Sequence, residues 1–312
     1  MKFFSKRVVL VLIAAILVLG ILPVQAFAHH HESDDARTNA TVSPEGYLAY
    51  QAIVDQLNAE YGSEVSLLPL EEYEQNNLPL PGAASVADLA GFEENTRAFI
   101  EKILTENFIA ECECVKAYLD PTQTYFEGRL PSFSNTTPWA VKMMAKVIIA
   151  EGYSIDVVKY IAEQNDAFSA AIHSYGYLPN EENMQSAEQS VLQEEPTGEM
   201  TRVVYPGKRY NISHAYGTPY IIGDLNNGNG FWQWINTPTI GWTVKGTVPT
   251  LVSVSVAAKS LIDSSRTWSV TYSGTLMYYY QATPQSQPVT VQTPYSVNIA
   301  FNAGSAAAYN GL

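Results

Sequence analysis

Apolar residues recur every three or four positions through the first half of the chain, which is the spacing of one face of an α-helix. The clearest stripe consists of Ile100, Leu104, Phe108, Cys112, Val115 and Leu119. It predicts a long helix over Val86–Leu119, after a shorter helix over residues 44–61. A third helix is expected over Trp139–Ala150, and a fourth is expected to follow Ser154. Such stripes indicate helices that bury one another in a bundle, and a groove for a partner is the alternative.

After residue 201 the apolar period changes from helical spacing to strict alternation, which is typical of half-buried strands. The alternating stretches are Val252–Ala257, Trp268–Ser273 and Tyr295–Asn302. Shorter strands are expected over Val203–Tyr205, Tyr220–Ile222, Phe231–Ile235 and Trp242–Val244. About seven short antiparallel strands favour a sandwich or small barrel. The sequence therefore predicts an α+β protein, with an N-terminal helical domain followed by an antiparallel β-sandwich or small barrel.

Charge changes along the chain at the same place as the apolar period. Residues 29–200 hold 29 acidic and 8 basic side chains, a net charge of −21, whereas residues 201–312 hold 2 acidic and 6 basic ones, a net charge of +4. Between the two patterns lies a stretch rich in Glu, Gln and Ser, which is typical of a linker. The predicted parts are a disordered segment over 29–43, an acidic helical domain over 44–179, a linker over 180–201 and a β domain over 202–312.

Residues 1–28 follow the plan of a secretory signal peptide. The basic residues are Lys2, Lys6 and Arg7, and the apolar run that follows is Val8–Leu22. Small residues precede a cut after Ala28, and the run is short of the ~20 residues that span a bilayer. We therefore expect a secreted protein with a net charge of −17 and no stable membrane anchor after cleavage, rather than an anchored one. This acidic balance argues against nucleic acid as a partner.

Motifs for nucleophilic, zinc-dependent or nucleotide chemistry are absent from the sequence: it has no G-x-S-x-G, H-E-x-x-H, P-loop or G-x-G-x-x-G. Ser213, His214 and Asp224 could be written as a triad, but neighbours in a strand face opposite sides of the sheet. We therefore predict no catalytic residue and no cofactor. Glu151 and His173 are the candidate groups if the protein is instead a hydrolase acting through carboxylates.

Three segments contain metal-ligand residue types, but each has a simpler interpretation. A cut after Ala28 would expose His29–His31, which could chelate Cu²⁺ or Ni²⁺, although chain termini are usually loose. Asp224–Gly230 resembles a calcium loop but departs from its pattern, and an Asn-Gly hairpin turn explains it better. Cys112 and Cys114 point about 200° apart on a helix, so we expect two buried or idle thiols rather than a disulfide or metal site.

Aromatic residues are concentrated in the predicted β domain, which has ten Tyr, four Trp and two Phe. Two dense clusters lie at Phe231–Trp234 and Tyr278–Tyr280. Because side chains alternate faces along a strand, at least one aromatic of each cluster is expected to point outward, where it could stack on sugars or partner surfaces. A role in the core is the alternative. The predicted binding residues are Trp232, Trp234, Tyr278, Tyr279 and Tyr280.

The stretches Ser260–Trp268 and Tyr272–Thr275 resemble a β-domain cassette of uncharacterised secreted proteins from Gram-positive bacteria. Tyr61–Glu74 is similar to the helical part of such proteins, and no activity comes with this resemblance. The function expected is that of a non-enzymatic extracellular binding or interaction protein, whose partner is a cell-wall or extracellular glycan or a protein. The alternatives are an extracellular hydrolase and a helix-mediated membrane contact. Basic amphipathic helices, which would favour membrane contact, are lacking in the acidic half.

Overall fold

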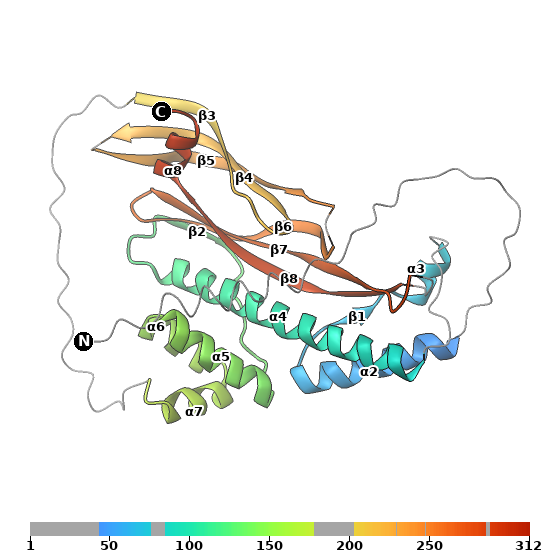
Figure 1. Cartoon of the computed structure of the whole chain (residues 1–312). Helices are drawn as coiled ribbons and strands as arrows, with labels where there is room; N and C mark the ends of the chain where they lie inside the picture. The colour runs from blue at the N-terminus through green and yellow to red at the C-terminus, as the bar shows by residue number, and fades with distance from the viewer. Residues whose placement is uncertain (1–43, 76–84, 178–202, 229, 247, 285–287) are drawn as a thin grey trace, which may run out of the picture. The chain divides into compact units, whose positions relative to one another are not determined.

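Helices and strands stack in layers in the computed structural model of the chain (Figure 1). It describes residues 44–75, 85–177, 203–228, 230–246, 248–284 and 288–312. The predicted signal peptide and the predicted linker lie outside these residues, as does the His29–His31 segment. The long helix α4 lies between a sheet on one side and three shorter helices on the other.

The two helices predicted with the clearest spacing are confirmed. Helix α2 covers Pro44–Tyr61 and helix α4 covers Val86–Leu119. α4 begins with a capping box, in which the Ser85 hydroxyl accepts from the Asp88 N–H and the Asp88 carboxylate accepts from the Ser85 N–H. These two bonds satisfy backbone donors that an isolated helix end would leave without a partner.

The predicted third helix is confirmed, but the fourth is two helices rather than one. Shorter helices are α3 (Leu70–Gln75), α5 (Pro138–Glu151), α6 (Ile155–Ala162) and α7 (Asp166–Ser174). The break between α6 and α7 is due to Asn165, whose side-chain oxygen accepts from the Phe168 N–H at 2.9 Å as the N-cap of α7. Its amide also donates to the carbonyls of Phe133 and Asn135. This one buried side chain therefore fixes both the break between α6 and α7 and the loop that precedes α5.

Eight strands in the described part of the chain form two antiparallel sheets. The five-stranded sheet has the order β1 (Ser66–Leu67), β8 (Val289–Asn302), β7 (Thr267–Tyr280), β6 (Thr250–Ile262) and β2 (Tyr125–Gly128). The three-stranded sheet has the order β3 (Val203–Asn211), β4 (Gly217–Gly228) and β5 (Phe231–Val244), and α8 (Ala303–Tyr309) follows β8. The α+β class, with helices before antiparallel sheets, is confirmed.

One strand replaces the two that were predicted at Phe231–Ile235 and Trp242–Val244, because β5 runs through both. The register between β4 and β5 shifts between Ile222 and Asp224. Asp224 holds this bulge by accepting from the Gly207 N–H and from the Asn236 side chain. Asn236 has a φ of 65°, so it bends β5 without ending it.

The hairpin predicted at Asp224–Gly230 is present, but Asp224 to Gly228 form the end of β4, and Gly228 pairs with Phe231 of β5. Strands β1 and β2 were not predicted, and both come from the helical half of the chain. They pair with β8 and β6 and so extend the sheet at its two edges. A strand as short as β1 has no alternation that a sequence pattern could reveal.

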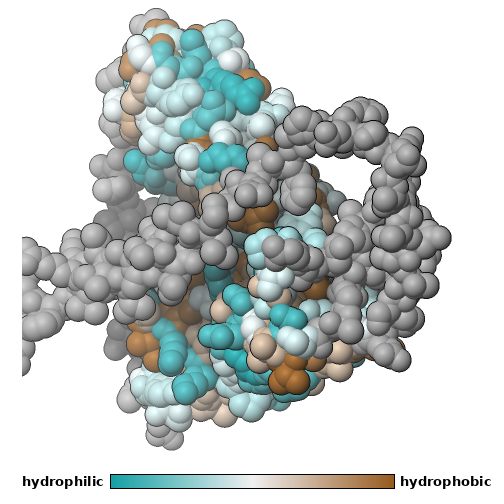
Figure 2. All heavy atoms as spheres, turned by 45° about the vertical axis from the view of Figure 1, so that its right-hand side comes forward, coloured by the Kyte–Doolittle hydropathy of each residue, from teal (hydrophilic) through white to brown (hydrophobic). Residues whose placement is uncertain are grey.

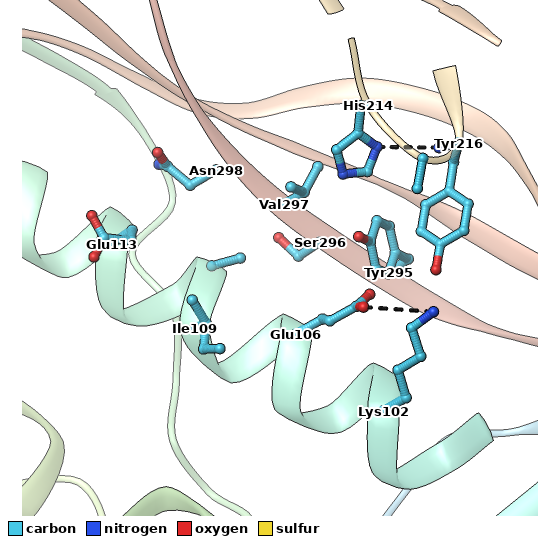
Figure 3. Close-up of a pocket in the computed structure, with 12 residues that line it drawn as sticks. Lys102, Glu106, Ile109, Glu113, His214, Tyr216, Tyr295, Ser296, Val297 and Asn298 are labelled. Carbon is cyan, nitrogen blue, oxygen red and sulfur yellow. Dashed lines mark hydrogen bonds and ion pairs between the residues drawn. The ribbon is translucent and has the colours of Figure 1, made fainter. Parts of the chain in front are cut away.

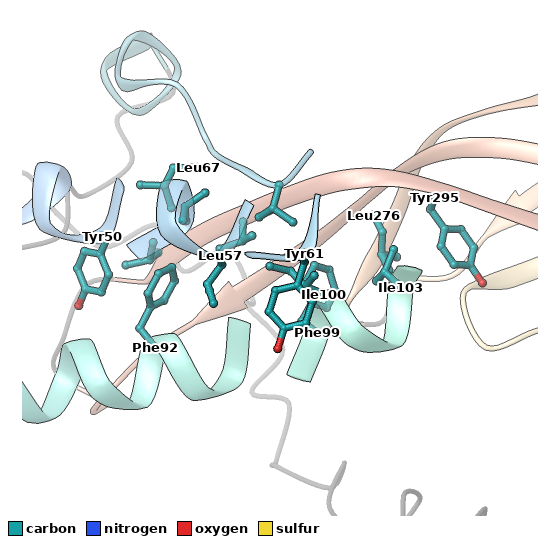
Figure 4. Packing of buried hydrophobic residues seen from close by; sticks show 14 of the residues in the cluster. Tyr50, Leu57, Tyr61, Leu67, Phe92, Phe99, Ile100, Ile103, Leu276 and Tyr295 are labelled. Carbon is teal, nitrogen blue, oxygen red and sulfur yellow. The ribbon is translucent and has the colours of Figure 1, made fainter. Parts of the chain in front are cut away.

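Three buried hydrophobic clusters hold these layers together. The first joins the helices to the five-stranded sheet, as where Leu57 and Ile100 pack with Leu276 (Figure 4). The second lies among α4, α5, α6 and α7, and the third lies between the two sheets, where Trp234 meets Phe301. Residues Thr41–Leu312 accordingly group as one compact unit. The division at residues 180–201 stays a prediction.

Hydrophilic and near-neutral residues dominate the face shown in Figure 2, and hydrophobic ones form small, separate patches there. No helix of the described residues is long and apolar enough to cross a membrane.

Replacing Asn165 with Ala should lower the free energy of unfolding by roughly 2–4 kcal/mol, because it removes an N-cap and leaves two carbonyls without their donor. Urea denaturation followed by circular dichroism measures this. Asn95→Ala is the matched control, since the Asn95 amide bonds at an exposed site on α4, and it should change stability by less than about 0.5 kcal/mol. Equal effects of the two substitutions would contradict the role given to Asn165.

Candidate functional site

A cleft of about 300 Å³ opens between α4, β8 and the turn from β3 to β4 (Figure 3). We call it the α4–β8 cleft. Its walls are Lys102, Glu106, Ile109, Ala110, Glu113, His214, Ala215, Tyr216, Tyr295, Ser296, Val297 and Asn298. The volume is at the lower end of the range for small-molecule sites. Both apolar and ionisable side chains line this cleft. It therefore offers apolar contact area together with a few polar groups that could orient a ligand.

Helix α4 supplies the ionisable wall of this cleft. Lys102, Glu106 and Glu113 lie four and seven residues apart, so they share one face of the helix. Lys102 Nζ lies 3.8 Å from Glu106 Oε1, which is a long ion pair. Burial raises the pKa of Glu106, and this effect exceeds the opposing effects of Lys102 and of the Tyr295 hydroxyl, which both lower the pKa.

The opposite wall is the turn from β3 to β4, where His214 is positioned by several contacts. Its Nδ1 accepts from the Tyr216 N–H at 3.3 Å, and its ring packs edge-on against Trp242 at a centroid distance of 5.1 Å. Burial and the nearby Lys245 lower the pKa of His214, which favours a neutral ring. With Nδ1 as acceptor, Nε2 carries the proton, and this second nitrogen is turned towards the cleft (Figure 3).

Two polar atoms of the cleft walls are buried and make no well-formed hydrogen bond with the residues described, although Lys102 lies close enough to interact with one of them, the Tyr216 hydroxyl. They are the hydroxyl oxygen of Tyr216 and Oε2 of Glu106. Tyr216 is only 4% exposed, and its ring is held edge-on by Tyr295 at 5.3 Å. Buried polar groups are almost always bonded, so a pair of exceptions on facing walls indicates a place where a ligand could bond.

A second cleft, of about 260 Å³, lies on the other side of α4, and we call it the α4–α5 cleft. Its walls are Gly62–Glu64, Leu104, Asn107, Phe108, Glu111, Ser132–Asn135, Ala140, Met143, Met144, Thr293 and Pro294. Burial raises the pKa of Glu111 to about 7, and no charged neighbour contributes to this shift. Glu111 is therefore a carboxyl group that titrates near neutral pH.

The five predicted binding aromatics do not form one surface. Trp234 lies in the core at 1% exposure, where its Nε1–H donates to the Phe301 carbonyl. Trp232 is half-buried against the ring of Tyr205.

Of the three tyrosines of β7, two pack against the first hydrophobic cluster. Tyr278 stacks on Phe99 and Tyr280 packs edge-on against Phe92, so both are tied to α4. Tyr279, at 44% exposed, is the one fully open to solvent among the five. The five side chains therefore do not form a single stacking surface.

The other candidates from the sequence lie away from both clefts. Glu151 and His173 are exposed and line neither cleft. Asp224 is exposed and bonds Gly207 and Asn236, so no triad with His214 forms. Within the residues described, no group of three or more His, Cys, Asp or Glu could hold a metal ion.

Sequence reasoning missed Lys102, Glu106, Tyr216 and Tyr295 as a group. They come from α4, β8 and the turn before β4, and only the folded chain brings these together. His214 was noticed as the lone histidine of the β half, but its partners could not be identified from spacing. No family model, curated protein or solved structure matches the chain.

Both thiols should be unreactive in the native chain. Cys112 and Cys114 are free and buried, as predicted, and burial raises the pKa of each thiol. A colorimetric thiol reagent should therefore label neither cysteine until denaturant is added, and then label both. Rapid labelling of one thiol in the native chain would contradict this.

Replacing Glu111 with Gln should stabilise the chain at about pH 8 by roughly 2–3 kcal/mol and leave its stability at about pH 4 unchanged. The unfolded state ionises this carboxyl above pH 4.5, whereas the folded state keeps its proton up to about pH 7, so stability falls as pH rises between these values. Urea denaturation at several pH values measures the effect. Glu94→Gln, on the exposed side of α4, should show no such dependence, and an equal gain there would contradict the prediction.

Proposed function

We propose that the chain is a secreted, non-enzymatic binding protein whose ligand occupies the α4–β8 cleft. The observation that carries this proposal is the pair of buried atoms without a well-formed hydrogen bond, the Tyr216 hydroxyl and Glu106 Oε2. Each is costly to leave unbonded, and a ligand that bonds both would recover that free energy. Secretion rests on the signal-peptide pattern of residues 1–28, after whose removal no stable membrane anchor is expected.

The ligand class that suits these walls is neutral and rich in hydroxyl groups. Lys102 and Tyr216 offer donors, whereas Glu106 and Glu113 offer acceptors. A hydroxyl group donates and accepts at once, so a sugar can satisfy both kinds of group while its ring packs against Tyr295. An anionic ligand such as a nucleic acid would face two carboxyl groups and a strongly acidic chain. We therefore propose a segment of a cell-wall or extracellular glycan as the partner, ahead of a protein.

A carboxylate hydrolase is the second candidate, and one observation favours it. The raised pKa of Glu106 suits a general acid, and Glu113 lies on the same face of α4, roughly 10 Å further along the axis. The carboxyl groups of glycosidases lie about 5–10 Å apart, and the spacing of these two residues along the helix is of that order. Measuring new reducing ends after incubation with oligosaccharides separates the candidates: turnover lost in Glu106→Gln would favour the hydrolase, and no turnover with intact binding would favour the binding protein.

Replacing Tyr216 with Phe should weaken binding of a neutral oligosaccharide by about tenfold, because it removes a donor from the cleft. The unfolding free energy should change by less than about 1 kcal/mol, since that hydroxyl makes no well-formed hydrogen bond in the ligand-free chain and interacts only weakly with Lys102. Isothermal titration calorimetry of the full chain with cello-, chito- and malto-oligosaccharides measures the affinity.

Tyr279→Ala is the control for this experiment, because it removes an exposed aromatic outside the cleft and should leave the affinity unchanged. Loss of binding in Tyr279→Ala but not in Tyr216→Phe would place the ligand on the exposed aromatic instead. Binding of none of the oligosaccharides would overturn the glycan as the ligand class.

A further inference from the structure

The α4–α5 cleft is separate from the cleft proposed above and differs from it in chemistry. Its floor is apolar and includes Phe108, Phe133 and Met144, all buried in the second hydrophobic cluster. Phe108 and Phe133 meet edge-on at a centroid distance of 5.7 Å. Two residues with carboxyl groups, Glu64 and Glu111, also line the cleft. No Lys, Arg or His is among its lining residues.

The amide side chains of the rim are hydrogen-bonded within the protein. Asn107 donates to the Pro294 carbonyl and accepts from the Ser296 N–H. Asn135 donates to the carbonyls of Tyr61 and Gly62 and accepts from Thr137. These amides are neutral, so they do not balance the charge of a carboxylate in the cleft.

Glu111 has no cation to balance it. None of the salt bridges of the described residues includes Glu111, and its pKa is shifted by burial alone. A partly buried carboxylate without a partner is unfavourable, and a positively charged ligand would relieve that cost. The other titratable groups near Glu111 are Glu64 at the rim and the buried thiols of Cys112 and Cys114, and none of these supplies positive charge.

The chemistry of the lining residues determines which class of cation the cleft can bind. Ca²⁺ and Mg²⁺ require about six or more oxygen ligands. Ser, Thr and Asn side chains also line the cleft, but within the described residues no group of three or more His, Cys, Asp or Glu could hold a metal ion. An ammonium group attached to an apolar body can instead pair with Glu111 and place its body against Phe108 and Phe133, where aromatic faces attract cations. Met143 and Met144 are flexible and polarisable, so they can adapt to the shape of that body.

We propose that the α4–α5 cleft is a binding site for an organic ammonium ion with an apolar body, held by Glu111 over the floor formed by Phe108, Phe133 and Met144. Such a group occurs in free amines and in the lysine side chains of peptides, and the chemistry of recognition is the same for both. Binding should tighten as Glu111 loses its proton, that is, as the pH rises through about 7.

The test compares 2-phenylethylamine with 2-phenylethanol, which have similar size and differ in charge. Isothermal titration calorimetry of the full chain at about pH 8 should show the amine binding at least about tenfold more tightly than the alcohol, and this preference should fall to nearly none at about pH 5. In Glu111→Gln the amine should bind no better than the alcohol at either pH. Glu94→Gln, with its exposed carboxyl group removed, should keep the preference of the unmodified chain.

A lysine-containing peptide with free side chains forms a second arm, with the same peptide acetylated on lysine as its control. Tighter binding of the unmodified peptide than of the amine identifies a protein as the source of the ammonium group, and the reverse identifies a free amine. Equal binding of amine and alcohol, absence of binding by all probes, or an unchanged preference in Glu111→Gln would each overturn the proposal. Because Glu111→Gln is expected to stabilise the chain, a loss of binding in that variant would not reflect unfolding.

Discussion

The packing of α4 against two different cores is the constraint on which the rest of the structure depends. This helix has 34 residues, about 50 Å at 1.5 Å per residue, which is longer than any single cluster it contacts. Its first half, through Phe92 and Ile103, packs with α2 and the five-stranded sheet, and its second half, through Phe108 and Val115, packs with α5, α6 and α7. An amphipathic helix with one apolar stripe leaves a polar face to solvent, but α4 must bury residues on more than one side.

Glutamates near the change from one core to the other are consequently held in partly buried positions. Glu106 and Glu111 both have a raised pKa, and in both cases burial is the main cause. The two clefts lie at the same junction, because neither the sheet nor the short helices cover α4 completely there. The candidate sites thus result from how the long helix passes between its two cores, which explains why they contain carboxyl groups whose pKa is raised by burial.

Local patterns were sufficient for elements that obey a single period. The stripe of α4 and the turn signals around it determine its bounds, and the same holds for α2. Patterns were insufficient where a side chain made a long-range bond: Asn165 divides one expected helix into two, and Asp224 joins two expected strands into one. Strand β6 shows the same limit, because its register shifts twice against β7 and Val256 becomes exposed although it continues the alternation.

The candidate site was harder to foresee than the fold for a similar reason. Alternation correctly implied that an aromatic of each cluster points outward, as Tyr279 does, but it could not tell which aromatics the helices would cover. The residues of the α4–β8 cleft are ordinary in the sequence and become notable only through an unmet hydrogen bond, which is a property of the folded chain.

Asn107 connects the two clefts. It lines the α4–α5 cleft, yet its side chain bonds the backbone of β8 at Pro294 and Ser296, and Ser296 lines the α4–β8 cleft. This pair of bonds ties the middle of α4 to the middle of β8, so the helix cannot rotate to widen one cleft without breaking them. Ligands at the two sites would therefore both contact α4, which these bonds hold against β8. Any effect of one ligand on the affinity for the other would have to pass through this contact between α4 and β8.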